Sequence, residues 1–255
     1  MALYALYSDL LSGDTVTITA GSEDTEYPKE NVSDRLSRTV GKFTGTTGTY
    51  RRTFSGSKTA QAAVFLNTNA TAIQLTNAAG LNQAISIPAT PEDSRHLDPW
   101  IDLRAVANNA STTWNAALTG PAGVALGDFI LIENLREMEV LFEPSPAEGE
   151  SHPVIHHETD YDADLFYGKG VRTRRGLVSA RNVAARATFL ALERAQRGRL
   201  RPWIFIPNEA LNDALLVHLE SEPMRIVPIA FGAADFTTYL SDVTISVKEQ
   251  QKGLI

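Results

Sequence analysis

The sequence predicts a mainly β protein, in which an N-terminal β-sandwich precedes a smaller, β-rich α+β domain with one helix. Three observations support this fold class. Short runs of alternating apolar residues, separated by Gly, Asn, Thr and Ser, recur through the first 138 residues. A stretch rich in proline and acidic residues then interrupts the pattern between residues 143 and 153. The clearest helical periodicity follows it, between residues 183 and 197.

The first part of the chain contains five segments with the length and alternation of strands. Turn residues separate them, and no long helical pattern occurs among them, so we expect an antiparallel sandwich. The five segments are residues 15–19, 62–66, 72–75, 84–87 and 129–132.

The second part begins after the proline-rich stretch, which we interpret as a linker between a domain of residues 1–142 and a domain of residues 154–255. Its helix, at about 183–197, has Asn182 as a candidate N-cap and Gly198 as a terminator. Five small or apolar residues fall on one face: Ala184, Thr188, Ala191, Leu192 and Ala195. Strands are expected at 163–168, 171–179, 202–207 and 243–247.

The amino-acid composition excludes several classes of function. The chain has 255 residues, of which 43% are hydrophobic, and its longest apolar runs are too short to span a membrane. The N-terminus, Met1-Ala2-Leu3-Tyr4, lacks the basic start of a signal peptide, so we expect synthesis in a cytoplasm. There is no cysteine, which excludes disulfides and thiolate chemistry.

Charge is unevenly distributed along the chain. The net charge is -7, but residues 169–201 contain ten basic residues and one acidic residue, a local +9 that leaves -16 for the remainder. The overall balance argues against nucleic-acid binding. The basic stretch is either a solvated helix face or a surface for an acidic partner, such as another copy of the chain. The candidate interface residues are Arg172, Arg174, Arg175, Arg181, Arg199 and Arg201.

The first 140 residues resemble the galactose-binding-like (discoidin-type) β-sandwich, a jelly roll. The opening pattern is Ala20-Gly21-Ser22-Glu23, then Tyr27-Pro28, then Glu30-Asn31-Val32-Ser33-Asp34-Arg35. Later patterns are Ala63 to Asn69 and Thr113 to Leu118, followed by Gly127 to Ile132. One departure is Gly41-Lys42-Phe43-Thr44, where such domains usually have a tryptophan.

The whole layout also resembles tail-tip and baseplate proteins of tailed bacteriophages. The order that carries this resemblance is Arg172-Thr173-Arg174-Arg175-Gly176, the helix, then Arg201-Pro202-Trp203, with a final tyrosine-bearing strand at Tyr239. The resemblance implies a structural protein of the virion tail, made in the host cytoplasm. Its implied partners are other tail proteins and copies of itself, with a host glycan as a possible partner.

One cluster of metal-capable side chains lies just after the linker: His152, His156, His157, Glu158, Asp160, Asp162 and Asp164. A calcium loop from Asp160 would need Gly at position 165 and Glu at 171, which are Leu and Val. A zinc helix from His157 would need histidine where Tyr161 stands. We therefore expect no metal or other cofactor, and interpret the segment as a solvated edge strand or an Asp-to-Arg contact between subunits.

Catalytic motifs are missing from the sequence. There is no Gly-x-Ser-x-Gly elbow, and Gly168-Lys169-Gly170 lacks the preceding glycine of a phosphate-binding loop. A glycosidase needs only two carboxylates beside a cleft, which no sequence pattern excludes. We expect a protein that is not an enzyme, with no catalytic residues.

Two functions compete. The main hypothesis is a virion structural protein that acts by protein assembly in a tail tip or baseplate. The alternative is a carbohydrate-binding module that attaches a particle or enzyme to cell-surface glycans. Among the tryptophans, Trp114 and Trp203 are expected in the core, whereas Trp100, beside Pro99 and after a polar run, is expected to be exposed as a sugar platform.

Overall fold

The computed structural model covers the whole chain. It describes residues 2–35, 39–87, 98–138, 141–144, 150–151, 154–159, 162–167, 171–172, 175–181, 190–192, 194–195, 201–207, 209, 213–219, 225–229 and 240–249.

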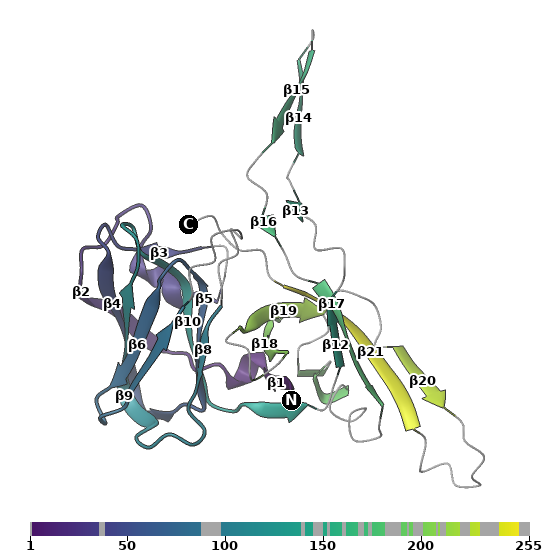
Figure 1. The fold of residues 1–255 in the computed structure, drawn as a ribbon, viewed down its shortest axis with the longest axis horizontal. Helices are drawn as coiled ribbons and strands as arrows, with labels where there is room; N and C mark the ends of the chain where they lie inside the picture. Colours follow the sequence, from purple (N-terminus) through teal and green to yellow (C-terminus); the bar gives the residue numbers. More distant parts are fainter. Residues whose placement is uncertain are drawn as a thin grey trace.

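The N-terminal part is a sandwich of two antiparallel sheets (Figure 1). The five-stranded sheet has the order β2 (Asp14–Ala20), β4 (Thr47–Thr59), β9 (Ala110–Thr119), β6 (Ala72–Asn77) and β7 (Asn82–Ser86). The four-stranded sheet has the order β3 (Gly41–Lys42), β10 (Ala125–Ile132), β5 (Ala62–Thr68) and β8 (Trp100–Asp102). The predicted mainly β fold class is confirmed, as are all five strands expected in this part.

Strand β4 is the longest strand and was not among those expected. Its buried residues alternate with more exposed ones: Gly48, Tyr50, Arg52 and Phe54 face the interior. This period of two is the signature of a strand with one buried face. The bulky Phe43 ring packs against the first of them, since a Cβ on Gly48 would lie 2.3 Å from that ring. Phe43 lies in the segment where galactose-binding-like domains usually have a tryptophan, and it is fully buried.

Strands β5 and β10 are buried on both faces, unlike the strands of the five-stranded sheet. On β5, Phe65 points into the sandwich core, while its neighbours Val64 and Leu66 belong to a second core on the opposite face. On β10, Phe129 and Ile130 divide in the same way. Such strands read as continuous apolar runs, which explains why both were recognisable in the sequence.

The second core is covered by a large antiparallel sheet of eight strands. Its order is β11 (Arg136–Met138), β1 (Ala2–Ala5), β18 (Trp203–Ile206), β19 (Leu215–Leu219), β21 (Leu240–Glu249), β17 (Arg175–Arg181) and β12 (Leu141–Pro144), with β20 (Arg225–Ile229) paired to β21. Strands β1, β18 and β19 lie between the sandwich and the rest of this sheet (Figure 1). The first strand of the chain therefore pairs with a strand about two hundred residues later.

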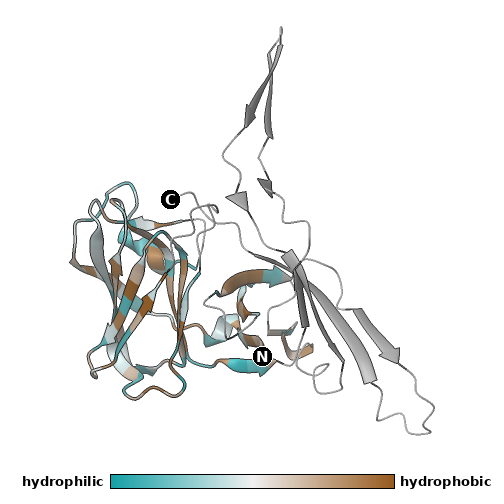
Figure 2. Cartoon of the chain, viewed as in Figure 1, coloured by the Kyte–Doolittle hydropathy of each residue, from teal (hydrophilic) through white to brown (hydrophobic). Residues whose placement is uncertain are grey.

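Hydrophobic packing joins the sandwich to the eight-stranded sheet. Leu3 of β1, with Ile204 and Ile206 of β18, packs on the outer face of β5 and β10. Figure 2 shows hydrophobic residues along β5, β10 and β19. Each large apolar side chain buried here contributes about 1.5–3 kcal/mol. The four-stranded sheet is thus the middle layer of the described body. The division into domains 1–142 and 154–255 stays a prediction, with β1 pairing across it.

Two further sheets contain only two strands each. One pairs β13 (Glu150–Ser151) with β16 (Val171–Arg172), and the other pairs β14 (Val154–Thr159) with β15 (Asp162–Tyr167). The expected strand 171–179 is therefore divided between β16 and β17, and 163–168 corresponds to β15.

The single expected helix is described only in part. Residues 190–192, 194 and 195 are helical, and the rest of the range 183–197 lies outside the described residues. Leu192 is buried as expected, but Ala191, predicted on the same face, is exposed. Two short 3-10 helices, η1 (Tyr7–Asp9) and η2 (Lys29–Ser33), occur earlier in the chain. In the described part of the chain, no helix is long and apolar enough to cross a membrane.

Candidate functional site

The chain passes from β1 into the sandwich through the 3-10 turn η1, which places Tyr7 at the junction of the two units. The Asp9 carboxylate accepts a hydrogen bond from the Leu6 amide (3.0 Å), and the Asp9 amide donates to the Leu6 carbonyl (2.9 Å). These reciprocal bonds fix the turn. The Tyr7 ring packs at the edge of the second core and stays partly exposed.

Two arginines from distant parts of the chain approach the Tyr7 ring. The guanidinium carbon of Arg35 lies 4.4 Å from the ring centroid, and that of Arg201 lies 5.5 Å from it. Arg35 has a φ of 60°, in the left-handed region, and its Nη2 donates to the Leu10 carbonyl (2.8 Å). Left-handed backbone is uncommon outside glycine, and such conformations cluster at binding sites. Arg201 immediately precedes Pro202 at the start of β18.

The Tyr7 surface, which we define as Tyr7, Arg35 and Arg201, carries two positive charges, neither of which forms an ion pair with a carboxylate among the described residues. The nearby Asp9 carboxylate is already occupied, because both of its oxygens accept hydrogen bonds from Arg136. Two guanidinium groups on one partly exposed ring concentrate positive charge, which solvent screens only in part. The surface is therefore suited to bind a carboxylate or another anion.

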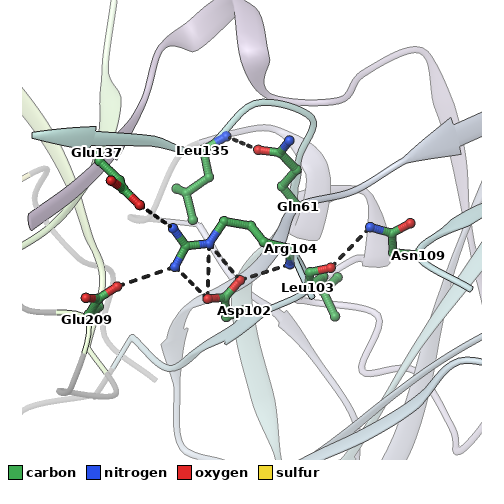
Figure 3. A network of polar contacts seen from close by, with 8 residues as sticks. All are labelled: Gln61, Asp102, Leu103, Arg104, Asn109, Leu135, Glu137 and Glu209. Atoms are coloured by element: carbon green, nitrogen blue, oxygen red, sulfur yellow. Dashed lines mark hydrogen bonds and ion pairs between the residues drawn. The ribbon is translucent and has the colours of Figure 1, made fainter. Parts of the chain in front are cut away.

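A second arginine at the same junction, Arg104, is surrounded by carboxylates (Figure 3). Arg104 donates to Asp102 through Nη2 (2.7 Å) and Nε (3.0 Å), and makes longer contacts of 3.4 Å with Glu137 and Glu209. The hydrogen bond to Asp102 raises the pKa of Arg104. Burial alone would raise the pKa of Asp102, but the hydrogen bonds and charge of Arg104 lower it overall. One cation thus faces three carboxylates, so this cluster joins parts of the fold and has no capacity left for an anion.

Neighbouring hydrogen bonds hold the loop that carries Arg104. The Asn109 side chain donates to the Leu103 carbonyl (3.1 Å), and the Leu135 amide donates to the side-chain oxygen of Gln61 (2.8 Å; Figure 3). The Arg104 amide itself donates to the Asp102 carboxylate (2.9 Å). Because Glu137 and Glu209 come from β11 and from the segment before β19, the cluster connects the sandwich to the eight-stranded sheet.

The interior of the sandwich contains a buried ion pair. Arg52 is 3% exposed, and its Nε and Nη2 each lie 2.6 Å from an oxygen of Asp14. Arg52 also donates to the carbonyls of Leu11 (3.1 Å) and Phe129. The bidentate geometry and the two carbonyls satisfy most of the guanidinium donors, which makes its burial tolerable.

Asp128, on β10, is a buried carboxyl without such a partner. It is completely buried, and in the described part of the chain its carboxyl oxygens have only a weak backbone contact from Arg35 in place of a well-aligned hydrogen bond. Burial raises its pKa to about 8, although the positive charge of Arg52 opposes the shift. Burial therefore favours the neutral form of Asp128, while the positive charges of Arg52 and Arg35 favour its carboxylate.

The predicted interface arginines are not gathered into one described surface. Arg172 ends β16 opposite Glu150, Arg175 begins β17 opposite Lys248, and Arg181 ends β17 opposite Asp242. Arg174 and Arg199 lie outside the described residues. Only Arg201 has a described side-chain contact, with Tyr7. The role of all six in an interface stays a prediction. Sequence reasoning missed Tyr7 and Arg35, for which no local pattern gives a signal.

The tryptophan prediction was wrong at Trp100. Trp114 and Trp203 are fully buried as expected, but Trp100 is also buried, at 5% exposure, and belongs to the second core. Its backbone pairs with Val64 on the middle sheet, where the eight-stranded sheet covers it. The polar run before Trp100 suggested exposure. The covering layer could not be recognised from the local sequence, because it comes from chain segments far away in the sequence.

The His152 to Asp164 segment contributes to the β14 and β15 strands. His157 stands opposite Asp164 and Glu158 opposite Ala163 in the register. Among the residues described, no group of three or more histidine or acidic side chains is placed to hold a metal ion. His152 and Asp160 lie outside the described residues.

No family model and no curated protein sequence matches this chain. Several solved structures are similar to part of it. The family 32 carbohydrate-binding module of Clostridium perfringens NanJ, solved in complex with galactose, has a TM-score of 0.37 and 8% identity, covering 53% of this chain and 100% of its own. A fucose-binding module of Streptococcus pneumoniae has a TM-score of 0.36 and 10% identity, covering 49% and 99%. An F5/8 type C domain of a Bacteroides fragilis protein has a TM-score of 0.39 and 8% identity, covering 51% and 97%.

Proposed function

We propose that this chain is a non-catalytic binding protein that works as a subunit of a larger assembly, in the role of a phage tail-tip or baseplate component that its layout resembles. The observation that carries the proposal is the β14–β15 arm, which we define as strands β14 and β15. Its six-pair antiparallel ladder forms a sheet of its own, to which no described strand of the body is added.

A two-stranded sheet is marginally stable in water, because it has no third strand and no core of its own. No described strand pairs with either outer edge of the β14–β15 arm, so the backbone donors and acceptors along these edges are candidates for pairing with another chain. A strand of a neighbouring subunit could pair with these groups. A separate two-stranded sheet of this kind therefore favours a protein that completes its structure on assembly.

The body of the molecule supports the same proposal. The middle sheet is covered on both faces, so the sandwich is packed into the chain as a rigid part of it. The charge distribution, +9 in residues 169–201 against -16 elsewhere, would allow complementary contacts between copies.

A glycan-binding role for the sandwich is the second candidate, and one feature of its loops favours it. Tyr27 is partly exposed, and the ammonium of Lys42 lies 5.0 Å from its ring centroid. Lys29 and Glu23 form an ion pair close by in the chain (3.8 Å). An aromatic ring bordered by charged and polar groups is a suitable surface for a sugar ring and its hydroxyls.

Sedimentation velocity of the full chain separates the two candidates. The assembly proposal expects concentration-dependent association at low salt, reduced at high salt because the contacts are charged. A chain that stays monomeric up to high concentration and fails to bind candidate tail proteins would overturn it. If that monomer binds an immobilised galactose or fucose glycan, and Tyr27→Ala abolishes binding, the glycan-binding candidate replaces it.

A further inference from the structure

The β14–β15 arm lies in the most acidic part of the sequence. Between Glu143 and Asp164 there are seven acidic residues and no lysine or arginine. They are Glu143, Glu148, Glu150, Glu158, Asp160, Asp162 and Asp164. Two of them, Asp162 and Asp164, lie on strand β15, and Glu158 lies on β14. The arm is thus a strongly anionic element.

The Tyr7 surface has the complementary charge. Arg35 and Arg201 carry two positive charges at one partly exposed ring, and neither forms an ion pair with a described carboxylate. The other arginines with described ion pairs are already occupied: Arg52 by Asp14, Arg136 by Asp9 and Arg104 by three carboxylates. Arg35 and Arg201 are therefore available to pair with a docking carboxylate.

We propose that the β14–β15 arm of one copy docks on the Tyr7 surface of a second copy, with carboxylates of the arm paired to Arg35 and Arg201. This inference rests on the proposed assembly function and specifies the two surfaces that are in contact. Guanidinium groups pair with carboxylates bidentately, and arginine with tyrosine is the combination enriched in protein interfaces. The contact joins a surface to a different surface, so it is heterologous and builds a ring or a filament rather than a two-fold dimer.

The chain itself contains a segment that can occupy the Tyr7 surface of a second copy. No described strand is added to the edges of the arm, and the arm lies in a stretch of the sequence rich in carboxylates. The Tyr7 surface has cations without a described ion pair, so one sequence supplies both halves of the contact. An acidic glycan offers the same carboxylate chemistry but would leave the edges of the arm unpaired. A second copy satisfies both requirements at once.

Charge exchange between full-length variants tests this contact. The first variant is Arg201→Glu, and the second is Asp162→Lys with Asp164→Lys on the arm. Each alone should weaken self-association at low salt by at least about tenfold, because like charges then face each other. An equimolar mixture should associate again, because the unchanged arm of Arg201→Glu can dock on the unchanged Tyr7 surface of the arm variant. The lysines introduced into the arm can in turn pair with the glutamate introduced into the Tyr7 surface. Lys58→Glu, on β4, applies the same charge change away from the contact and should associate like the wild type.

The outcomes distinguish this contact from assembly in general. If both variants associate like the wild type, or both are defective and their mixture stays dissociated although each melts normally, the contact is wrong while assembly stands. If the wild type itself does not associate, both proposals fail. If the wild type stays monomeric and binds an acidic oligosaccharide that Arg201→Glu does not bind, the Tyr7 surface is a glycan site and the proposal is overturned.

Discussion

Arginine side chains have opposite environments in the interior of the sandwich and at the junction beside it. Arg52 in the interior is 3% exposed and has a bidentate carboxylate and two carbonyls around it. Arg35 and Arg201 at the junction share one tyrosine ring and no described carboxylate. Inside the fold, a charge must be satisfied within the chain because its desolvation is costly. At the partly exposed junction, water meets that requirement, and the charges stay available for a partner.

The largest expected effect is at the interior pair. Replacing Arg52 with Met keeps most of the volume but leaves the Asp14 carboxylate buried without its partner, so we expect a loss of about 3–5 kcal/mol in the free energy of unfolding. Urea denaturation measures it. Adding Asp14→Asn to the variant should recover part of the loss, because the buried charge is then removed. A loss below about 1 kcal/mol would mean that the pair is not essential to the sandwich.

The next effect concerns Asp128, a buried carboxyl that lacks the partner that Asp14 has. Its pKa of about 8 lies above the ordinary value near 4, so stability falls as the pH rises through this window and the loss is complete above pH 8. Asp128→Asn should remove this part of the pH dependence and stabilise the protein at pH 8 by about 1–3 kcal/mol. Thermal melts between pH 5 and 9 test it, with exposed Glu26→Gln as the control. Parallel pH profiles for wild type and Asp128→Asn would contradict the buried-carboxyl interpretation.

A smaller effect is expected at the Arg104 cluster, which is intermediate between the two regions. Its carboxylates are 40–62% exposed, so water screens their attraction to the guanidinium. Arg104→Ala should therefore cost no more than about 1 kcal/mol, and the difference should shrink in 1 M salt. Urea denaturation at low and high salt measures both quantities. A salt-independent loss of several kcal/mol would show that this cluster stabilises the fold in the same way as the buried Arg52–Asp14 pair.

The smallest effect on stability is expected at the Tyr7 surface. Arg201→Glu removes a ring contact but no described hydrogen bond or ion pair, so its unfolding free energy should stay within about 0.5 kcal/mol of the wild type. The same urea series measures it, with Arg201→Lys as the conservative control. A marked destabilisation would show that the arginine serves the fold and not a partner.

The sequence predicted the strands whose side-chain pattern is local. β5 and β10 are apolar runs, and β6 alternates clearly, so each could be recognised without knowledge of its neighbours. β4 was missed because Arg52 occupies an inward position and breaks the apolar alternation, and only its pairing with Asp14 explains why it is tolerated there. β1 was missed because four residues carry little periodicity and its partner strand, β18, is about two hundred residues away.

The candidate site could be predicted only in outline. The basic stretch that includes Arg201 indicated a cationic surface, but the sequence separates Tyr7, Arg35 and Arg201 by long intervals, and tertiary packing alone brings them to one ring. Trp100 was misassigned for the same reason, since its covering strands come from both ends of the chain. Properties that depend on long-range contacts do not leave a local pattern.

Amide hydrogen exchange of the β14–β15 arm tests the central claim most directly. The strands of the arm form a sheet of two, so their amides should exchange rapidly in a dilute monomeric solution. On self-association of the wild type at low salt, exchange across residues 154–167 should slow by at least about tenfold, and this protection should be absent in Arg201→Glu at the same concentration. Exchange that is equally slow in dilute and concentrated wild-type samples, or equally slow in Arg201→Glu, would contradict an arm that is completed by the Tyr7 surface of a neighbour.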